Sequence, residues 1–322
     1  MFIAQGFKVK NNHFWKYIVG SIIVIIASGI GQLPWMIAVG IKMVSEGKSL
    51  ESLNPNTLMN TLGSNLTLFL MLFSFLIAIL VFYIIVRYLH GQKFIEVTTS
   101  RKKIDWKRIF FSFSLWATIT IITIIIAYFV SPENYEVQFQ PIPFAILAII
   151  SIVLIPIQTS TEEYVFRGYL MQGFALLSKN KLFSLVLTSM IFGLLHIANP
   201  EVDKLGYIIL VYYIGTGFFL GILTLMDEGM ELSLGFHAAN NLIGALLITS
   251  DWTVFQTHSI LKDNSEPSAG FDVLLPVIVI FPILLFIFSK KYNWKNWKEK
   301  LTGNIQTEDT KNEINELENK YE

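Results

Sequence analysis

The segment "STEEYVFRGYL" (residues 160–170) places two carboxylates and a guanidinium at the end of a long apolar run. The run covers residues 142–160 and contains no charged residue. A charge-free stretch of about this length predicts a membrane-spanning helix, because a helix satisfies its own backbone hydrogen bonds across ~30 Å of hydrocarbon. Glu162, Glu163 and Arg167 therefore lie where ionisable residues are costly and are candidates for function.

The composition extends this prediction to the whole chain. Of its 322 residues, 53% are hydrophobic and only 15% are charged, whereas soluble domains carry about 25% charged residues. Apolar runs of span length recur along the sequence, so we expect an all-α integral membrane protein with about eight transmembrane helices. The predicted spans are residues 18–41, 66–86, 109–130, 142–160, 182–198, 207–226, 232–249 and 271–289.

The distribution of Lys and Arg predicts the orientation, because cytoplasmic loops carry an excess of these residues. The N-terminal arm, the loop 87–108 and the segment 290–300 are basic, whereas residues 131–137 and 250–270 are acidic or neutral. Eight spans put both termini on one side, and we expect that side to be the cytoplasm. The membrane is expected to be the plasma membrane.

The chain is predicted to be one membrane domain, residues 1–300, followed by a polar cytoplasmic tail, residues 301–322, which is expected to be disordered. The first apolar run is too long for a signal peptide, so no cleavable signal is expected. The absence of cysteine excludes a thiolate nucleophile and Cys-ligated zinc. A net charge of zero with no basic face gives no basis for nucleic-acid binding.

Helical spacing separates the two glutamates. Glu163 and Arg167 are four residues apart with the acid first, the favourable order for an ion pair, whereas Glu162 points about 100° away. We therefore interpret Glu163 and Arg167 as structural support and Glu162 as the free carboxylate. The alternative is that all three form one salt-bridged cluster at the cytoplasmic interface.

Two later spans carry further polar residues. His196 follows Phe192 by one helical turn, and His237 precedes Asn241 by one turn, so each pair shares a helix face. The alternative for His196 is a core histidine bonded to a backbone carbonyl. The alternative for His237 and Asn241 is a polar pair that joins two helices.

The positions of these residues favour a common site. Glu162 and His196 flank "SKNK" (178–181), a predicted helix–helix turn, and each lies roughly 23 Å along its helix from that turn. A carboxylate in a low-dielectric cavity can act as a general base on water near neutral pH. Imidazole and carboxamide groups can orient the water and donate hydrogen bonds to a developing oxyanion. This set of groups predicts peptide-bond hydrolysis without a covalent nucleophile.

Three motifs carry a family resemblance: "EEYVFR" beginning at Glu162, "FGLLH" ending at His196, and "HAANN" beginning at His237. They resemble the EExxxR, FxxxH and HxxxN motifs of the CPBP intramembrane proteases, a family that includes CAAX prenyl endopeptidases, Abi proteins and bacteriocin-processing proteases. The resemblance covers roughly residues 140–250, which would be the protease core.

The resemblance implies eight transmembrane helices around a conical intramembrane active-site cavity that opens toward the cytoplasm. It implies that Glu162 activates water with help from His196, while His237 and Asn241 stabilise the oxyanion. Glu163, Arg167 and Phe192 match supporting positions, and Asn240 matches no motif position, so no role is assigned to it.

Some of these family members are described as metalloproteases, so a cofactor is considered as well. Glu162, His196 and His237 would be the ligands if zinc were bound. A metal-free base-and-oxyanion arrangement explains Asn241 better, and we expect no required cofactor.

The expected partners are the lipid bilayer and a membrane-associated peptide or protein substrate, which could be a prenylated C-terminus, a leader peptide or a membrane-protein segment. A non-catalytic membrane scaffold of the same fold is the first alternative function. A proton-coupled transporter is the second, although transporters usually show repeated halves and broken helices.

Overall fold

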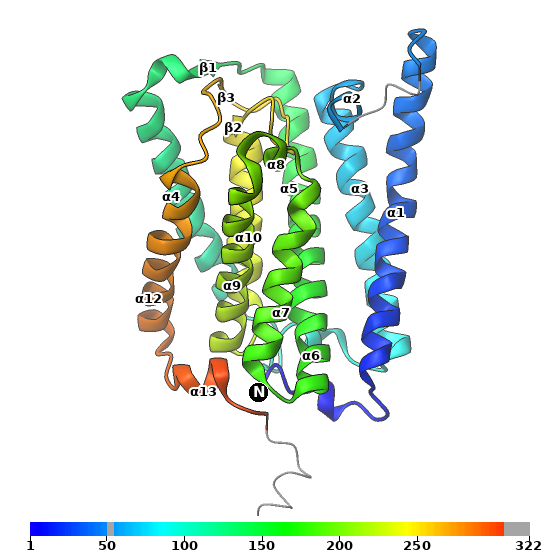
Figure 1. The fold of residues 1–322 in the computed structure, drawn as a ribbon, viewed down its shortest axis with the longest axis vertical. Helices are drawn as coiled ribbons and strands as arrows, with labels where there is room; N and C mark the ends of the chain where they lie inside the picture. The colour runs from blue at the N-terminus through cyan, green and yellow to red at the C-terminus, as the bar shows by residue number, and fades with distance from the viewer. Residues whose placement is uncertain (50–54, 306–322) are drawn as a thin grey trace, which may run out of the picture.

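The computed structural model describes residues 1–49 and 55–305, and it is a bundle of long helices that share one axis (Figure 1). Within the described residues, seven helical segments are long and apolar enough to cross a membrane. These segments are Phe14–Ser45, Ser64–Leu89, Trp106–Val130, Pro141–Ser178, Lys181–Ala198, Pro200–Asp227 and Val273–Tyr292. The prediction of an all-α membrane protein is therefore confirmed.

The long segments consist of several elements each. The N-terminal half contains η1 (Gln5–Lys8), α1 (Phe14–Ser45), α2 (Pro55–Asn60), α3 (Ser64–Ile84), η3 (Ile85–Leu89), η4 (Phe94–Val97), α4 (Trp106–Val130), η5 (Pro132–Asn134) and β1 (Tyr135–Val137). The middle contains α5 (Pro141–Glu163), the π-helix η6 (Tyr164–Leu170), α6 (Met171–Ser178), α7 (Lys181–Leu194), η7 (Leu195–Ala198), α8 (Pro200–Leu205), η8 (Gly206–Ile208) and α9 (Ile209–Asp227). The last part contains α10 (Glu231–Leu247), β2 (Ile248–Thr249), β3 (Leu261–Asp263), α11 (Phe271–Leu275), η9 (Pro276–Ile280), α12 (Phe281–Tyr292) and α13 (Trp297–Thr302).

Seven of the eight predicted spans coincide with these segments, and the predicted span at residues 232–249 does not. It corresponds to α10, which has 17 residues and is enclosed by α4, α5 and α9. Because α10 faces protein rather than lipid, it can carry the polar residues His237, Asn240 and Asn241. These residues lower the hydropathy of α10. By contrast, α1 exposes many large apolar side chains and forms an outer wall.

The helix that contains Glu162 continues well past it. Together, α5, η6 and α6 form one helical segment of 38 residues, Pro141–Ser178. At 1.5 Å per residue this segment is about 57 Å long, far more than ~30 Å of hydrocarbon. The added length lets Glu162 and His196 lie at one level, on either side of the turn between α6 and α7.

Hydrogen bonds join the helix connections at one end of the bundle into a surface that we call the terminal face. The Phe2 N–H donates to Glu228 Oε2 (2.6 Å), and Gln5 Nε2 donates to the Thr99 carbonyl (2.8 Å). The N-terminus and α13 both lie at this end (Figure 1). The terminal face comprises residues 1–16, 85–108, 178–181, 226–231 and 289–305.

The opposite end carries a small sheet, and we call it the sheet face. β1 pairs antiparallel with β3, and β2 pairs parallel with β3, in the order β1-β3-β2. The sheet lies beside α8 in Figure 1. The sheet face comprises residues 42–49, 55–64, 131–141, 195–208 and 248–270.

The bundle extends past the predicted domain end at residue 300. α13 packs against α7 and α9, and Ile305 is buried. The remainder of the predicted tail, residues 306–322, lies outside the described residues.

The contact between α10 and α4 depends on a residue without a side chain. A Cβ added at Gly235 would clash with the Ile109 carbonyl oxygen, which is backbone and cannot move aside easily. We expect Gly235→Ala to lower the free energy of unfolding by about 1–3 kcal/mol, as overpacking does. The melting temperature in detergent would measure this loss. Gly29→Ala is the matched control, because nothing lies within 4 Å of a Cβ at Gly29, and an unchanged Gly235→Ala protein would contradict the close contact.

His90 is buried in the connection between η3 and η4, outside the predicted spans. Its Nδ1 contacts Asn12 Oδ1 (2.9 Å), and its Nε2 contacts the Tyr169 hydroxyl (2.7 Å). Burial, reinforced by the positive charge of Lys16, lowers the pKa of His90 from 6.5 to about 4.

The unfolded chain therefore binds a proton at His90 at a higher pH than the folded chain does. Stability from the neutral ring is present above pH 6.5 and is lost as the pH falls toward 4. We expect the loss at pH 5 to be on the order of 1–2 kcal/mol. Melting temperatures measured between pH 7 and pH 5 should fall less steeply for His90→Gln than for the unaltered protein; parallel slopes would disprove the assignment.

Candidate active site

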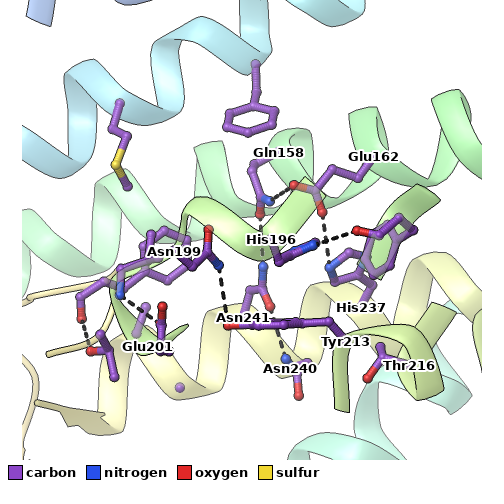
Figure 2. A pocket seen from close by; sticks show the side chains of 18 of the residues that line it. Gln158, Glu162, His196, Asn199, Glu201, Tyr213, Thr216, His237, Asn240 and Asn241 are labelled. Atoms are coloured by element: carbon purple, nitrogen blue, oxygen red, sulfur yellow. Dashed lines mark hydrogen bonds and ion pairs between the residues drawn. The ribbon is translucent and has the colours of Figure 1, made fainter. Parts of the chain in front are cut away.

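A cavity of about 560 Å³ lies inside the bundle, between α1, α3, α5, α9 and α10. All four residues predicted to be catalytic line it, and Figure 2 shows Glu162, His196, His237 and Asn241 around it. Phe192 also lines the cavity, whereas Glu163 and Arg167 lie behind its wall. Three segments separated in sequence therefore place their polar side chains on one enclosed surface.

Two glutamates hold the imidazole of His237 between them. His237 Nδ1 lies 2.8 Å from Glu163 Oε1, and Nε2 lies 3.5 Å from Glu162 Oε2. A carboxylate can only accept, so His237 carries a proton on Nδ1 and directs Nε2 toward Glu162. Glu163 thus fixes the ring orientation, as a carboxylate does for a catalytic or metal-bound histidine.

The expected ion pair between Glu163 and Arg167 is present and fully buried. Arg167 Nη1 donates to Glu163 Oε1 (2.9 Å), and Nη2 donates to the Gly217 carbonyl (3.2 Å). The guanidinium also lies 4.3 Å from the centre of the Phe192 ring. The pair joins α5 to α9 and stabilises the glutamate that positions His237.

The π-helix η6 begins at Tyr164, immediately after the two glutamates. Such irregular turns are common at functional sites because they change the register of a helix. Here the change separates α5, which carries Glu162, from α6, which packs on α7. The hydrophobic pattern of these residues does not predict this change.

His196 lies at the end of α7, in η7. Its Nδ1 lies 2.8 Å from the Phe192 carbonyl, and its ring stacks on Tyr213 with 4.3 Å between centroids. Because a carbonyl only accepts, the proton is on Nδ1, and Nε2 holds a lone pair. The backbone bond expected of a core histidine is therefore present, and it leaves Nε2 as an acceptor in a residue that lines the cavity.

A chain of amide groups leads to Glu162. Trp116 Nε1 donates to Asn240 Oδ1 (3.1 Å), and Asn240 Nδ2 donates to Asn241 Oδ1 (3.0 Å). Asn241 Nδ2 donates to Gln158 Oε1 (3.0 Å), and Gln158 Nε2 donates to Glu162 Oε1 (2.7 Å) (Figure 2). The chain fixes the amide of Asn241 and one oxygen of Glu162.

Sequence reasoning missed two members of this chain. Gln158 lies one helical turn before Glu162, and its polar side chain within an apolar span was the available signal. Asn240 received no role because it matches no motif position. In the structure it sets the orientation of Asn241, which only the packing of α10 against α4 could reveal.

Glu201 is a second cavity-lining carboxylate that the sequence did not single out. Its Oε1 accepts a hydrogen bond from the Val254 N–H (2.9 Å). Its Oε2 is buried and has no hydrogen-bond partner among the described residues. The signal was its place in "NPEVD", directly after the motif that ends at His196.

The donor atoms of the site do not meet the requirements of zinc. Zinc needs three or four ligand atoms at about 2 Å from one point. Within residues 1–49 and 55–305, no group of three His, Cys, Asp or Glu side chains is arranged to hold a metal ion. Glu162, His196 and His237 in their present positions therefore do not fit zinc, and no step is derived through it.

Comparisons with known proteins agree with the three motifs. The family model described as type II CAAX prenyl endopeptidase Rce1-like matches residues 141–243, a range that contains every predicted site residue. The uncharacterized protein YyaK of Bacillus subtilis (strain 168) is 31% identical over 286 residues, covering 87% of this chain and 94% of that protein. No solved structure matches. The chain is an integral membrane protein that belongs to the Rce1-like CAAX protease family.

Proposed function

We propose that the protein is an intramembrane endopeptidase that hydrolyses peptide bonds of membrane-associated substrates. One observation carries the proposal: a carboxylate and two imidazoles from three separate helices line one cavity inside the bundle. Glu162, His196 and His237 have no structural need to meet there, since burying polar groups away from water costs free energy. The family relationship supports the same reaction class.

Glu162 is the proposed general base. It removes a proton from a water molecule as the water oxygen bonds to the substrate carbonyl carbon, and the proton then passes to the leaving amine as the C–N bond breaks. The Nε2 lone pair of His196 accepts a hydrogen bond from this water and orients it. No covalent intermediate with the protein is formed.

His237 and Asn241 are the proposed oxyanion donors. Asn241 uses one N–H for Gln158 and keeps the second for substrate. His237 already donates from Nδ1 to Glu163, so its Nε2 donates when that nitrogen also carries a proton. Each well-placed donor stabilises the oxyanion by about 3 kcal/mol.

We propose that this reaction needs no metal, because the free N–H of Asn241 serves a base-and-oxyanion mechanism, whereas zinc ligands are His, Cys, Asp and Glu. We expect a metal chelator such as EDTA to leave the cleavage rate of the purified protein within twofold of its starting value. A rate that falls at least tenfold with chelator and returns with added zinc would contradict this.

The function is tested by comparing three strains that carry the unaltered gene, Glu162→Gln or a deletion. Mass spectrometry of membrane and released peptides should show the same processed termini missing in the Gln and deletion strains. A Glu133→Gln strain is the control, because Glu133 is exposed on the sheet face. If Glu162→Gln matches the unaltered strain while the deletion does not, the protein acts as a scaffold of the same fold.

A further inference from the structure

The cavity that holds Glu162 extends to only one end of the bundle. Its lining includes Asn199, Glu201 and residues 253–255, which belong to the sheet face. In the part of the chain that the structure describes, no terminal-face segment contributes to the lining. A substrate that reaches Glu162 along the bundle axis therefore comes from the sheet face.

Positive charge is concentrated at the other end. Of the 24 Lys and Arg residues, 17 lie in the terminal face and four lie in the sheet face; Arg167 is inside the bundle, and two fall outside the described residues. Those of the terminal face are Lys8, Lys10, Lys16, Arg87, Lys93, Arg101, Lys102, Lys103, Lys107, Arg108, Lys179, Lys181, Lys290, Lys291, Lys295, Lys298 and Lys300. Those of the sheet face are Lys42, Lys48, Lys204 and Lys262.

Three of the four cations of the sheet face form ion pairs. Lys42 and Lys48 both pair with Glu46 (3.0 and 2.7 Å), and Lys262 pairs with Asp251 (2.8 Å). Basic residues close to helix ends resist translocation, so the side of a membrane protein with more Lys and Arg faces the cytoplasm. The count of 17 against four makes the terminal face the cytoplasmic one.

We propose that the cavity opens on the extracytoplasmic side of the membrane and takes its substrate there. This rests on the proposed function and names its substrate class: a segment of polypeptide already across the membrane or exposed at its outer surface. The Lys and Arg pattern predicted cytoplasmic termini, and the family resemblance implied a cavity open to the cytoplasm. The structure makes these two expectations incompatible, because the termini and the cavity lie at opposite ends.

The orientation disfavours one substrate in particular. A prenylated C-terminal cysteine is made in the cytoplasm and is held at the inner leaflet by its lipid. Such a substrate would approach the terminal face, and no described segment of that face lines the cavity that holds Glu162. A released leader peptide or the outer segment of a membrane protein meets no such obstacle.

The chain offers a direct test because it contains no cysteine, so the unaltered protein has no thiol that a maleimide can label. Single substitutions Thr253→Cys and Ser268→Cys mark the sheet face, and Ser100→Cys and Thr302→Cys mark the terminal face. Protoplasts with intact membranes are treated with a membrane-impermeant maleimide, and the labelled fraction is compared with that after lysis.

We expect the two sheet-face cysteines to react in intact protoplasts and the two terminal-face cysteines to react at least tenfold more after lysis. The reverse pattern would place the cavity on the cytoplasmic side and overturn the proposal. Labelling of all four in intact protoplasts would indicate both insertion orientations and would overturn it as well. The labelling needs no cleavage, so it is repeated with Glu162→Gln to separate this inference from the proposed function.

A second readout connects the orientation to the cavity. Thr253 lines the cavity, whereas Ser268 lies on the sheet face away from it. A bulky impermeant maleimide added from outside should stop substrate processing in the Thr253→Cys protein and spare it in the Ser268→Cys protein. Processing that continues in both, with Thr253→Cys fully labelled, would show that substrate enters elsewhere.

Discussion

Replacing Glu162 by glutamine is expected to lower the cleavage rate by roughly 10³-fold, within the range of a lost general base. Glutamine keeps the shape of the side chain, and its oxygen can still accept the hydrogen bond from Gln158. Its amide can donate toward His237 Nε2, so both observed contacts survive. What is lost is the ability to take a proton from water. The rate is measured on a substrate identified from the processed termini.

The Glu162→Gln substitution should lower the cleavage rate without lowering the melting temperature to a similar degree. We expect the Glu162→Gln protein to melt within a few degrees of the unaltered protein, because no buried charge is left without a partner. Glu133→Gln supplies the control for a glutamate on the surface. A Glu162→Gln protein that keeps more than a tenth of the original rate would show that another group activates the water.

Replacing Arg167 by methionine is expected to give the largest loss of stability, about 3–5 kcal/mol. Both partners are buried, with side-chain exposures of 1% for Arg167 and 0% for Glu163. Methionine fills much of the same volume but leaves the Glu163 carboxylate as an uncompensated charge. The melting temperature in detergent measures the effect. Lys42→Met, which breaks the exposed pair with Glu46, should leave it unchanged.

The double variant Glu163→Gln with Arg167→Met distinguishes stability from catalysis. Removing both charges should recover most of the lost stability, because no unpaired ion remains in the bundle. Activity should stay about 10–100-fold low, since His237 loses the carboxylate that orients it. Full recovery of both properties would show that Glu163 supports only the fold.

The sequence alone predicts the long helices and singles out Glu162, His196 and His237, because hydropathy and ionisable residues within apolar spans are local signals. It also predicts the Glu163–Arg167 pair from spacing on one helix. It does not predict that His237 lies between the two glutamates, because this contact joins residues 74 positions apart through the packing of α10 on α5. The roles of Gln158 and Asn240 depend on the same packing.

The sheet face was beyond prediction for a different reason. Its strands have two or three residues each, too few to show an alternating pattern. Residues 131–137 and 250–270 therefore looked like plain loops. Their pairing brings the loop that contains Val254 over α8. There the Val254 N–H donates a hydrogen bond to Glu201 at the cavity. Which end of the bundle the cavity reaches is a property of the assembled helices, not of any motif.

The contacts of the first residues have a consequence for the order of folding. Phe2 and Ile3 are buried, and Phe2 and Gln5 bond to Glu228 and Thr99, partners 226 and 94 positions away. During synthesis, the segment 2–5 leaves the ribosome long before Glu228 is made, so it must wait unpacked while most of the bundle inserts. The loop between these partners closes late, because the entropic cost of closing it is offset only by contacts that need both partners in place. Phe2 is therefore packed only after Glu228, which is translated 226 positions later.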